Sequence, residues 1–242
     1  MKTPILITSL LLALVAAPLF ADEPEAEPAW TSTLGLSFVA TSGNSTTQTL
    51  GLDLAVARKP QPWGLELGAS ALRAEQEGDL TAERYLAFVR GKRALSERWE
   101  LFAGASGAQD EFAGFDLRAV VEGGAIYKAM LGPEHELAFD GGLTWTHEEY
   151  VTDLEDEYVG GVLGLAYAWH ITETAALAQR LKWYPNFETS EDWRAESETS
   201  LQAAVSTHVA LKLGYQVRYE NEPVAGFDDT DTTTTASLVF SL

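Results

Sequence analysis

The stretch VALKLGYQVRY, residues 209–219, decides the fold class of this chain. Every second residue in it is apolar: Val209, Leu211, Leu213, Tyr215, Val217 and Tyr219. The residues between them are small, polar or charged, and they include Lys212, Gln216 and Arg218. A period of two sends the two series to opposite faces of a sheet. The stretch is therefore predicted to be a strand with one apolar and one polar face.

The same alternation recurs along most of the chain, in segments separated by turn residues. The predicted strands lie near 30–41, 47–58, 63–73, 80–94, 99–109, 116–129, 135–147, 157–169, 175–184, 192–205, 209–220 and 231–242. They number about twelve, an even number as in bacterial membrane barrels. The segment 80–94 does not separate its faces, because Leu86 and Phe88 share a series with Arg84 and Arg90.

The N-terminus has the features of a secretory signal. Lys2 precedes an apolar run over 5–15, and small residues end at Ala21, so residues 1–21 are expected to be a cleaved signal peptide. The run is shorter than the roughly 20 residues that a membrane-spanning helix needs. Residues 22–29 are acidic and rich in proline, which predicts a disordered lead-in. Residues 30–242 then form one domain, an all-β, antiparallel, up-and-down transmembrane barrel of a Gram-negative outer membrane.

Charge and composition exclude several other classes. The formal net charge of −20 argues against nucleic acid and against simple adhesion to anionic headgroups. The chain has no Cys, which excludes disulfide-stapled and Cys-metal scaffolds. No apolar stretch after the signal reaches helical spanning length. A mean hydropathy of −0.07 still fits a barrel, because polar residues line its lumen.

The connections and the tryptophans predict the barrel's orientation. Short turns fall around 59–62, 95–98, 130–134, 170–174 and 206–208, and the opposite connections, 75–79, 110–115, 148–156, 185–191 and 221–230, are longer and acidic. This asymmetry is typical of periplasmic turns and external loops. All seven tryptophans fall near strand ends on the outward series, as in interfacial girdles. Four are predicted to be periplasmic and three external: Trp30, Trp63, Trp99 and Trp169, then Trp145, Trp183 and Trp193.

Six segments resemble, in the same order, a family of outer-membrane proteins described as salt-induced, which carries a domain of unknown function. They are TSGNSTTQTL (41–50), ERWELFAG (97–104), QDEFAGFDLR (109–118), GGAIYK (123–128), LKWYPNFETSEDWRAE (181–196) and YQVRYENEPVAGFDDTDT (215–232). The resemblance implies a single outer-membrane barrel and little about activity. The chain departs from the usual aromatic ending of such barrels, since it finishes at Leu242 with Phe240 two positions earlier.

No residue pattern predicts catalysis, a cofactor or a metal centre. His135, His170 and His208 fall at predicted periplasmic turns, and only His147 lies at the external edge. No Ser neighbours His147 in its strand, so the nucleophile and base of a barrel hydrolase are not brought together. We expect a non-catalytic protein, with a lipid- or lipopolysaccharide-modifying enzyme as a distant alternative.

The external loops are rich in carboxylates, which are ligands for hard cations such as calcium and magnesium. The residues are Asp110, Glu111, Asp116, Glu148, Glu149, Asp153, Glu155, Asp156, Glu157, Asp228, Asp229 and Asp231. They have no ordered ligand spacing, so a solvated acidic face is the favoured interpretation. Divalent cations shared with lipopolysaccharide phosphates are the alternative. Other expected partners are outer-membrane lipid and, during biogenesis, the barrel-assembly machinery.

Charged residues on the polar series are predicted to line the lumen: Arg180, Lys182, Arg194, Glu196, Glu198, Lys212 and Arg218. Glu196 is expected opposite Arg218, with Arg180 approaching Glu196 from the other side. Cross-strand pairs of opposite charge are worth roughly 0.2–1 kcal/mol each. They could brace a barrel with a structural or stress-response role, the favoured interpretation. Alternatively they form the constriction of a narrow, porin-like channel, with small residues at 160, 164, 166 and 168 leaving a passage.

Overall fold

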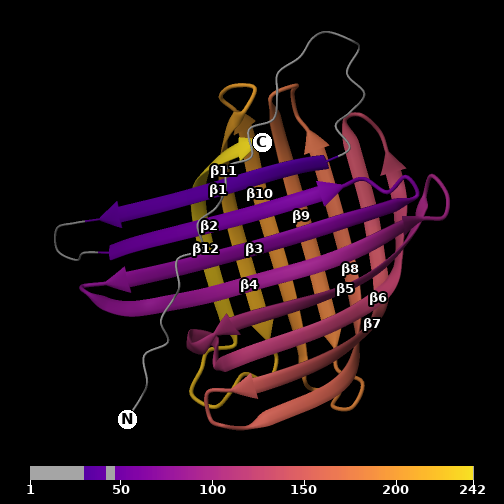
Figure 1. Cartoon of the computed structure of the whole chain (residues 1–242). Helices are drawn as coiled ribbons and strands as arrows, with labels where there is room; N and C mark the ends of the chain where they lie inside the picture. Colours follow the sequence, from indigo (N-terminus) through magenta and orange to yellow (C-terminus); the bar gives the residue numbers. More distant parts are fainter. Residues whose placement is uncertain (1–29, 42–46, 242) are drawn as a thin grey trace.

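The computed structural model describes residues 30–41 and 47–241, and this part of the chain forms twelve strands in one closed antiparallel barrel (Figure 1). The predicted signal peptide, the acidic lead-in, the SGNS turn at 42–45 and the terminal Leu242 lie outside the described residues. Within the described part, no helix is long and apolar enough to cross a membrane.

All twelve predicted strands are present in order, and their ends differ from the predicted ones by no more than a few residues. They are β1 (Trp30–Thr41), β2 (Thr47–Arg58), β3 (Trp63–Gln76), β4 (Asp79–Ala94), β5 (Trp99–Asp110), β6 (Phe115–Leu131), β7 (His135–Tyr150), β8 (Glu155–His170), β9 (Ala175–Pro185), β10 (Trp193–Ala204), β11 (Val209–Glu220) and β12 (Thr230–Ser241). A short 3-10 helix, Glu111–Ala113, connects β5 to β6.

Each strand pairs with its neighbours in sequence, and β12 pairs with β1 to close the ring. Closure gives each strand a neighbour on both sides, although the described parts of β1 and β12 pair over only five residues each. Side-chain alternation then decides the two faces. On β11, Leu211, Leu213 and Tyr215 are exposed on the outside, whereas Lys212 and Arg218 point into the lumen, where they contact other charged side chains. The predicted two-faced strand is confirmed.

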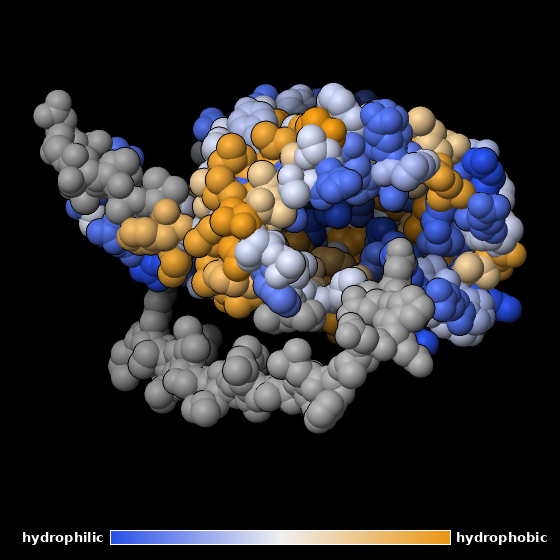
Figure 2. Space-filling model, turned by 90° about the horizontal axis from the view of Figure 1, so that it is seen from above, coloured by the Kyte–Doolittle hydropathy of each residue, from blue (hydrophilic) through white to orange (hydrophobic). Residues whose placement is uncertain are grey.

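The barrel is flattened, so that two walls face each other across the lumen. In Figure 1, strands β1 to β7 run across the view in front, and β8 to β12 run steeply behind them. Figure 2 looks down on the end where β12 finishes and shows a central hollow with hydrophilic residues inside it. A small apolar cluster of Phe102, Ile126 and Val162 also lies within the lumen.

The faces of β4, which the sequence left unassigned, are settled by its register with β3. Leu86 and Phe88 lie on the inner face together with Arg84 and Arg90. The ring of Phe88 covers Gly68, where a Cβ atom would overlap it. The lumen wall is therefore partly apolar, which is why periodicity alone could not separate the faces of this strand.

The predicted difference in loop length is wrong for three connections. Residues 77–78, 111–114 and 151–154 form links as short as the turns at the opposite end, while 186–192 and 221–229 are longer. The strands extend further than their apolar alternation, as the pairing of Glu149 with Glu155 illustrates. Ladder hydrogen bonds join backbone groups, so charged residues can continue a strand.

The closest backbone approach that glycine permits lies between β6 and β7. A Cβ atom on Gly124 would lie 2.6 Å from the Cα atom of Gly142, whereas a Cβ atom on Gly107 of β5 would meet nothing within 4 Å. We expect Gly124→Ala to destabilise the barrel by about 1–3 kcal/mol, because the two strands must move apart. Gly107→Ala is the matched control and should be near neutral. Urea unfolding of both variants in lipid vesicles, followed by tryptophan fluorescence, measures the difference.

Candidate functional site: ion pairs across the lumen

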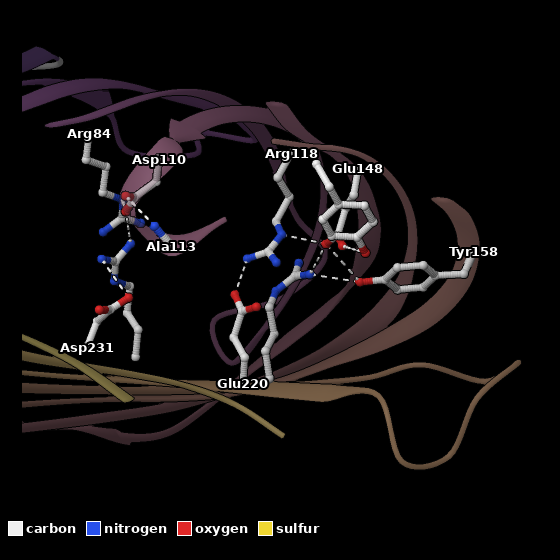
Figure 3. A network of polar contacts seen from close by, with 11 residues as sticks. Arg84, Asp110, Ala113, Arg118, Glu148, Tyr158, Glu220 and Asp231 are labelled. Atoms are coloured by element: carbon white, nitrogen blue, oxygen red, sulfur yellow. Dashed lines mark hydrogen bonds and ion pairs between the residues drawn. The ribbon is translucent and has the colours of Figure 1, made fainter. Parts of the chain in front are cut away.

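The most unusual feature of the lumen is a set of charged side chains that reach from one wall to the other near the end with the longer loops (Figure 3). We call this set the cross-lumen bridge. Its members are Arg84, Asp110, Arg118, Glu148, Tyr158, Arg194, Arg218, Glu220 and Asp231. They come from β4 to β8 on one side and from β10 to β12 on the other.

One half of the bridge is centred on Asp110, at the end of β5. Arg218 Nη1 donates to Asp110 Oδ2 at 2.8 Å, and Arg84 Nε lies 3.9 Å from the same oxygen. Arg218 also contacts Asp231 at 3.3 Å. Strands β5 and β11 lie on opposite sides of the closed strand order. Because these two strands form a direct ion pair, the width of the lumen at this level is no more than the length of two side chains.

Asp110 is held in place by the turn that follows it. Its Oδ1 accepts a hydrogen bond from the backbone N–H of Ala113 at 3.1 Å, as the cap of the short 3-10 helix. Gly114 ends that helix with φ at +93°, a conformation that glycine adopts without strain. One carboxylate oxygen thus fixes the turn, and the other is presented to Arg218.

The other half of the bridge is centred on Arg118 and Glu148. Arg118 Nε donates to Glu148 Oε1 and its Nη1 donates to Glu220 Oε1, both at 2.5 Å. The guanidinium of Arg118 also covers the Phe115 ring at 4.2 Å. Because Glu220 belongs to β11 and Glu148 to β7, Arg118 joins the two walls.

Glu148 is the most heavily used acceptor in the bridge. Besides Arg118 it accepts from Tyr150 Oη at 2.6 Å, Tyr158 Oη at 3.2 Å and Arg194 Nη1 at 3.3 Å. Only 4% of its side chain is exposed. A carboxylate buried to this extent stays charged at low cost only when cations and donors surround it.

The exposure of the charged lumen side chains differs widely. The side chains of Asp110 and Glu148 are 5% and 4% exposed, whereas Arg180, further toward the short turns on β9, is 71% exposed. Arg180 belongs to the inner series of β9 and faces Glu198 at 3.8 Å. The lumen is therefore closed at the bridge and open to solvent around Arg180, although Glu100 and the Arg90–Glu122 pair, also outside the bridge, are buried in the wall.

The predicted lumen residues all lie on inner series, with one pairing corrected. Glu196 is opposite Arg218 in the ladder, as predicted. Arg180 does not approach Glu196, because the register of β9 with β10 sets Arg180 against Glu198 and Lys182 against Glu196. Lys212 also pairs with Glu198, at 3.2 Å, while Arg194 lies buried in the bridge.

Most residues of the bridge were not predicted from the sequence to lie in the lumen. Asp110, Glu148 and Asp231 were assigned to acidic external loops, but in the structure their carboxylates pair with arginines inside the barrel. The alternation of β7 offered a signal, since Glu148 continues the inner series of Thr144 and Thr146. The contacts across the lumen carry no such signal, because they join strands far apart in sequence.

Two of the four small residues of β8 that the sequence suggested would leave a passage, Gly160 and Gly164, do not leave one. A Cβ atom on Gly164 would overlap the carboxylate of Asp140, and one on Gly160 would overlap the Pro185 carbonyl. The space beside both glycines is filled by neighbouring residues. They serve the packing of the wall.

His147 is the histidine that the sequence placed at the external edge. His147 faces outward and contacts Glu157 at 3.1 Å and Glu149 at 3.3 Å. Among the described residues, no group of three or more His, Cys, Asp or Glu side chains could hold a metal ion.

In the loop before β10, burial raises the pKa of Asp192, an effect that the hydrogen bond from Asn186 Nδ2 opposes.

All seven tryptophans lie on the outward series of their strands. Five of them are among the exposed large apolar residues: Trp30, Trp63, Trp99, Trp145 and Trp183. Two of the seven pack against tyrosines on neighbouring strands, Trp99 against Tyr127 at 4.9 Å between ring centroids and Trp193 against Tyr219 at 5.1 Å.

Comparison with known proteins identifies the family. The model of the family described as protein of unknown function DUF481 matches residues 34–242. The chain belongs to this family. It is 27% identical over 222 residues to the uncharacterized protein YdiY of Escherichia coli K12, covering 91% of this chain and 86% of that protein.

Two solved barrels are among the similar structures. The NanC porin has a TM-score of 0.48 at 13% identity, covering 88% of this chain and 98% of the porin. The translocator domain of the autotransporter NalP from Neisseria meningitidis has a TM-score of 0.49 at 10% identity, covering 90% and 89%.

Proposed function

We propose that this protein is a non-catalytic barrel of the outer membrane with a structural role in the envelope, and that the cross-lumen bridge braces it. The observation that carries the proposal is the direct ion pair between opposite walls, Arg218 with Asp110 at 2.8 Å. A stress-response role follows only from the resemblance to proteins described as salt-induced, and it is part of the proposal.

Membrane insertion is supported by the outer surface. Large apolar side chains such as Phe38, Leu50 and Leu143 are 59–67% exposed on the outward series. A continuous surface of this kind is costly in water and favourable in lipid. The tryptophans near both ends of the strands fit the headgroup levels. Lipid, lipopolysaccharide and the barrel-assembly machinery are therefore the proposed partners, and divalent cations at the remaining acidic loops are a further one.

Bracing is supported by the geometry of the bridge. A flattened barrel with facing walls can change its width without breaking any ladder hydrogen bond. Ion pairs in a poorly hydrated lumen resist such movement, because separating them leaves charges buried without partners. The bridge joins β4 to β7 with β10 and β11, so it opposes both widening and collapse of the external end.

The second candidate is a narrow channel, which the solvent-exposed part of the lumen favours. Arg180 and Phe88 lie on inner series, yet they are 71% and 38% exposed. Figure 2 shows a hollow at the end where β12 finishes. Rearrangement of the bridge would extend this hollow through the barrel. Under this alternative the bridge is the constriction that selects solutes.

Recording in planar lipid bilayers separates the two candidates. A braced, closed barrel should give rare or no openings across many insertions. Stable openings of the wild-type protein would favour the channel. Heat-modifiable migration on a gel and fractionation with outer membranes test the membrane assignment, and recovery as a soluble periplasmic protein would contradict it.

A further inference from the structure

The outer face of β9 to β12 carries polar side chains where the other outward series are mainly apolar. Gln179 on β9 lies between Leu177, which pairs with Trp169, and Trp183, so it lies between the two tryptophan levels. Ser197 and Thr199 share this outer face on β10, and the row continues onto the next two strands. The patch consists of Gln179, Ser197, Thr199, Tyr215, Thr232 and Thr234.

The patch is organised by hydrogen bonds between strands. Thr199 Oγ1 donates to Gln179 Oε1 at 2.5 Å, and Gln179 Nε2 donates to Ser197 Oγ at 3.0 Å. These bonds lower the cost of placing an amide in hydrocarbon but leave acceptor sites on the same oxygens free. Lipid tails cannot use those sites, and lipopolysaccharide sugars lie at the headgroup level, above this row. The chemistry therefore favours a protein surface.

The shape of this face gives a second, independent observation. A groove of about 420 Å³ runs over the small side chains Ala195 and Ser197, between the larger Trp183 and Tyr219. Beside it, Tyr215 and Leu213 project with 49% of their surface exposed. A projection and a groove on one face are what a symmetric pair of identical subunits requires, since each supplies the projection for the other's groove.

The incomplete pairing of β1 with β12, beside the patch, also supports a covering protein surface. In the part of the chain that the structure describes, β1 and β12 pair from Thr33 with Ser241 to Ser37 with Ser237. Among the described residues, 38–41 of β1 and 233–236 of β12 would continue this register but form no pairs with each other. Backbone groups without partners are expensive in lipid, so a covering surface is most useful here.

We propose that two copies of this chain associate side by side in the membrane through the outer face of β9 to β12, with the patch at the centre of a two-fold interface. This inference rests on the proposed insertion into the membrane. It does not depend on whether the lumen conducts.

Cysteine cross-linking tests the interface, and the absence of native Cys makes the test clean. Thr199→Cys places a thiol in the centre of the patch, close to the proposed two-fold axis. Leu143→Cys is the matched control, because Leu143 is 63% exposed on the outer face of β7. In outer membranes, oxidation should convert Thr199→Cys into a species of twice the protomer mass and leave Leu143→Cys as protomer. Equal cross-linking of the two variants, or cross-linking of Thr199→Cys to an unlike protein, would overturn the proposal.

An apolar variant supplies a second measurement. Gln179→Leu with Thr199→Val removes the amide and one hydroxyl while keeping the outer face suited to lipid. The wild-type protein in mild detergent should have the mass of a dimer by light scattering, and the variant that of a monomer. Heat-modifiable migration of both proteins shows that the barrel still forms. A monomeric wild type that is correctly inserted would contradict the dimer while leaving the membrane assignment intact.

Discussion

Replacing Glu148 with alanine should destabilise the barrel by about 3–5 kcal/mol, the cost of leaving buried charges without their partner. Arg118 and Arg194 both donate to this carboxylate, and their side chains are only 13% and 10% exposed. Glu220 retains one contact with Arg118, so the compensation is partial. The free energy of unfolding in lipid vesicles, followed by tryptophan fluorescence in urea, measures the loss.

The adjacent Glu149 provides the control for this experiment. It carries the same charge one residue away, but it faces outward and 46% of its side chain is exposed. Glu149→Ala removes only a contact with His147, and exposed pairs of this kind are worth about 0–1 kcal/mol. Equal losses for the two variants would mean that the bridge contributes nothing beyond surface charge.

Removing two of the three arginines that join the walls, Arg118 and Arg218 but not Arg194, should open the lumen. In the double variant Arg118→Gln, Arg218→Gln, the ion pairs from β5 and β6 to β11 are lost. Asp110 and Glu220 lose their arginine on the opposite wall, and Glu148 keeps only Arg194 of its two arginines. We expect frequent openings in planar bilayers, several-fold more than for the wild type, with cation selectivity from the uncompensated carboxylates.

Arg180→Gln is the control for this second prediction. It removes a lumen charge of the same type, but from the exposed region below the bridge, where Arg180 faces Glu198 on the neighbouring strand. Its openings should be as rare as those of the wild type. If Arg180→Gln opened the barrel as effectively as the double variant, the closure would not lie in the bridge.

Much of the fold could be predicted from the sequence because it depends on local information. The period of two in segments such as 209–219 fixes both the strand and its two faces, and the short turns fix antiparallel neighbours. The short turn between β10 and β11 also predicts the register of these two strands, so that Glu196 could be placed opposite Arg218. The strand ends were less accurate, because polar residues such as Glu149 and Glu155 continue the ladder after the apolar alternation has ended.

The bridge could not be predicted because it depends on the cross-section of the barrel. A round barrel would hold Asp110 and Arg218 far apart, and only the flattened shape brings β5 against β11. Acidic residues at strand ends, such as Glu148 and Asp231, were therefore assigned to solvent. The faces of β4 could not be assigned for a related reason. Phe88 lies inside the barrel against Gly68, although inner series are usually polar.

The sidedness of access to the lumen tests the central claim most directly. With no native Cys, Arg180→Cys places a single thiol in the open region below the bridge. A membrane-impermeant maleimide should label it when the reagent is admitted to the periplasm and leave it unlabelled when added outside intact cells. Equal labelling from the two sides would contradict a lumen that the ion pairs of the bridge close at its external end.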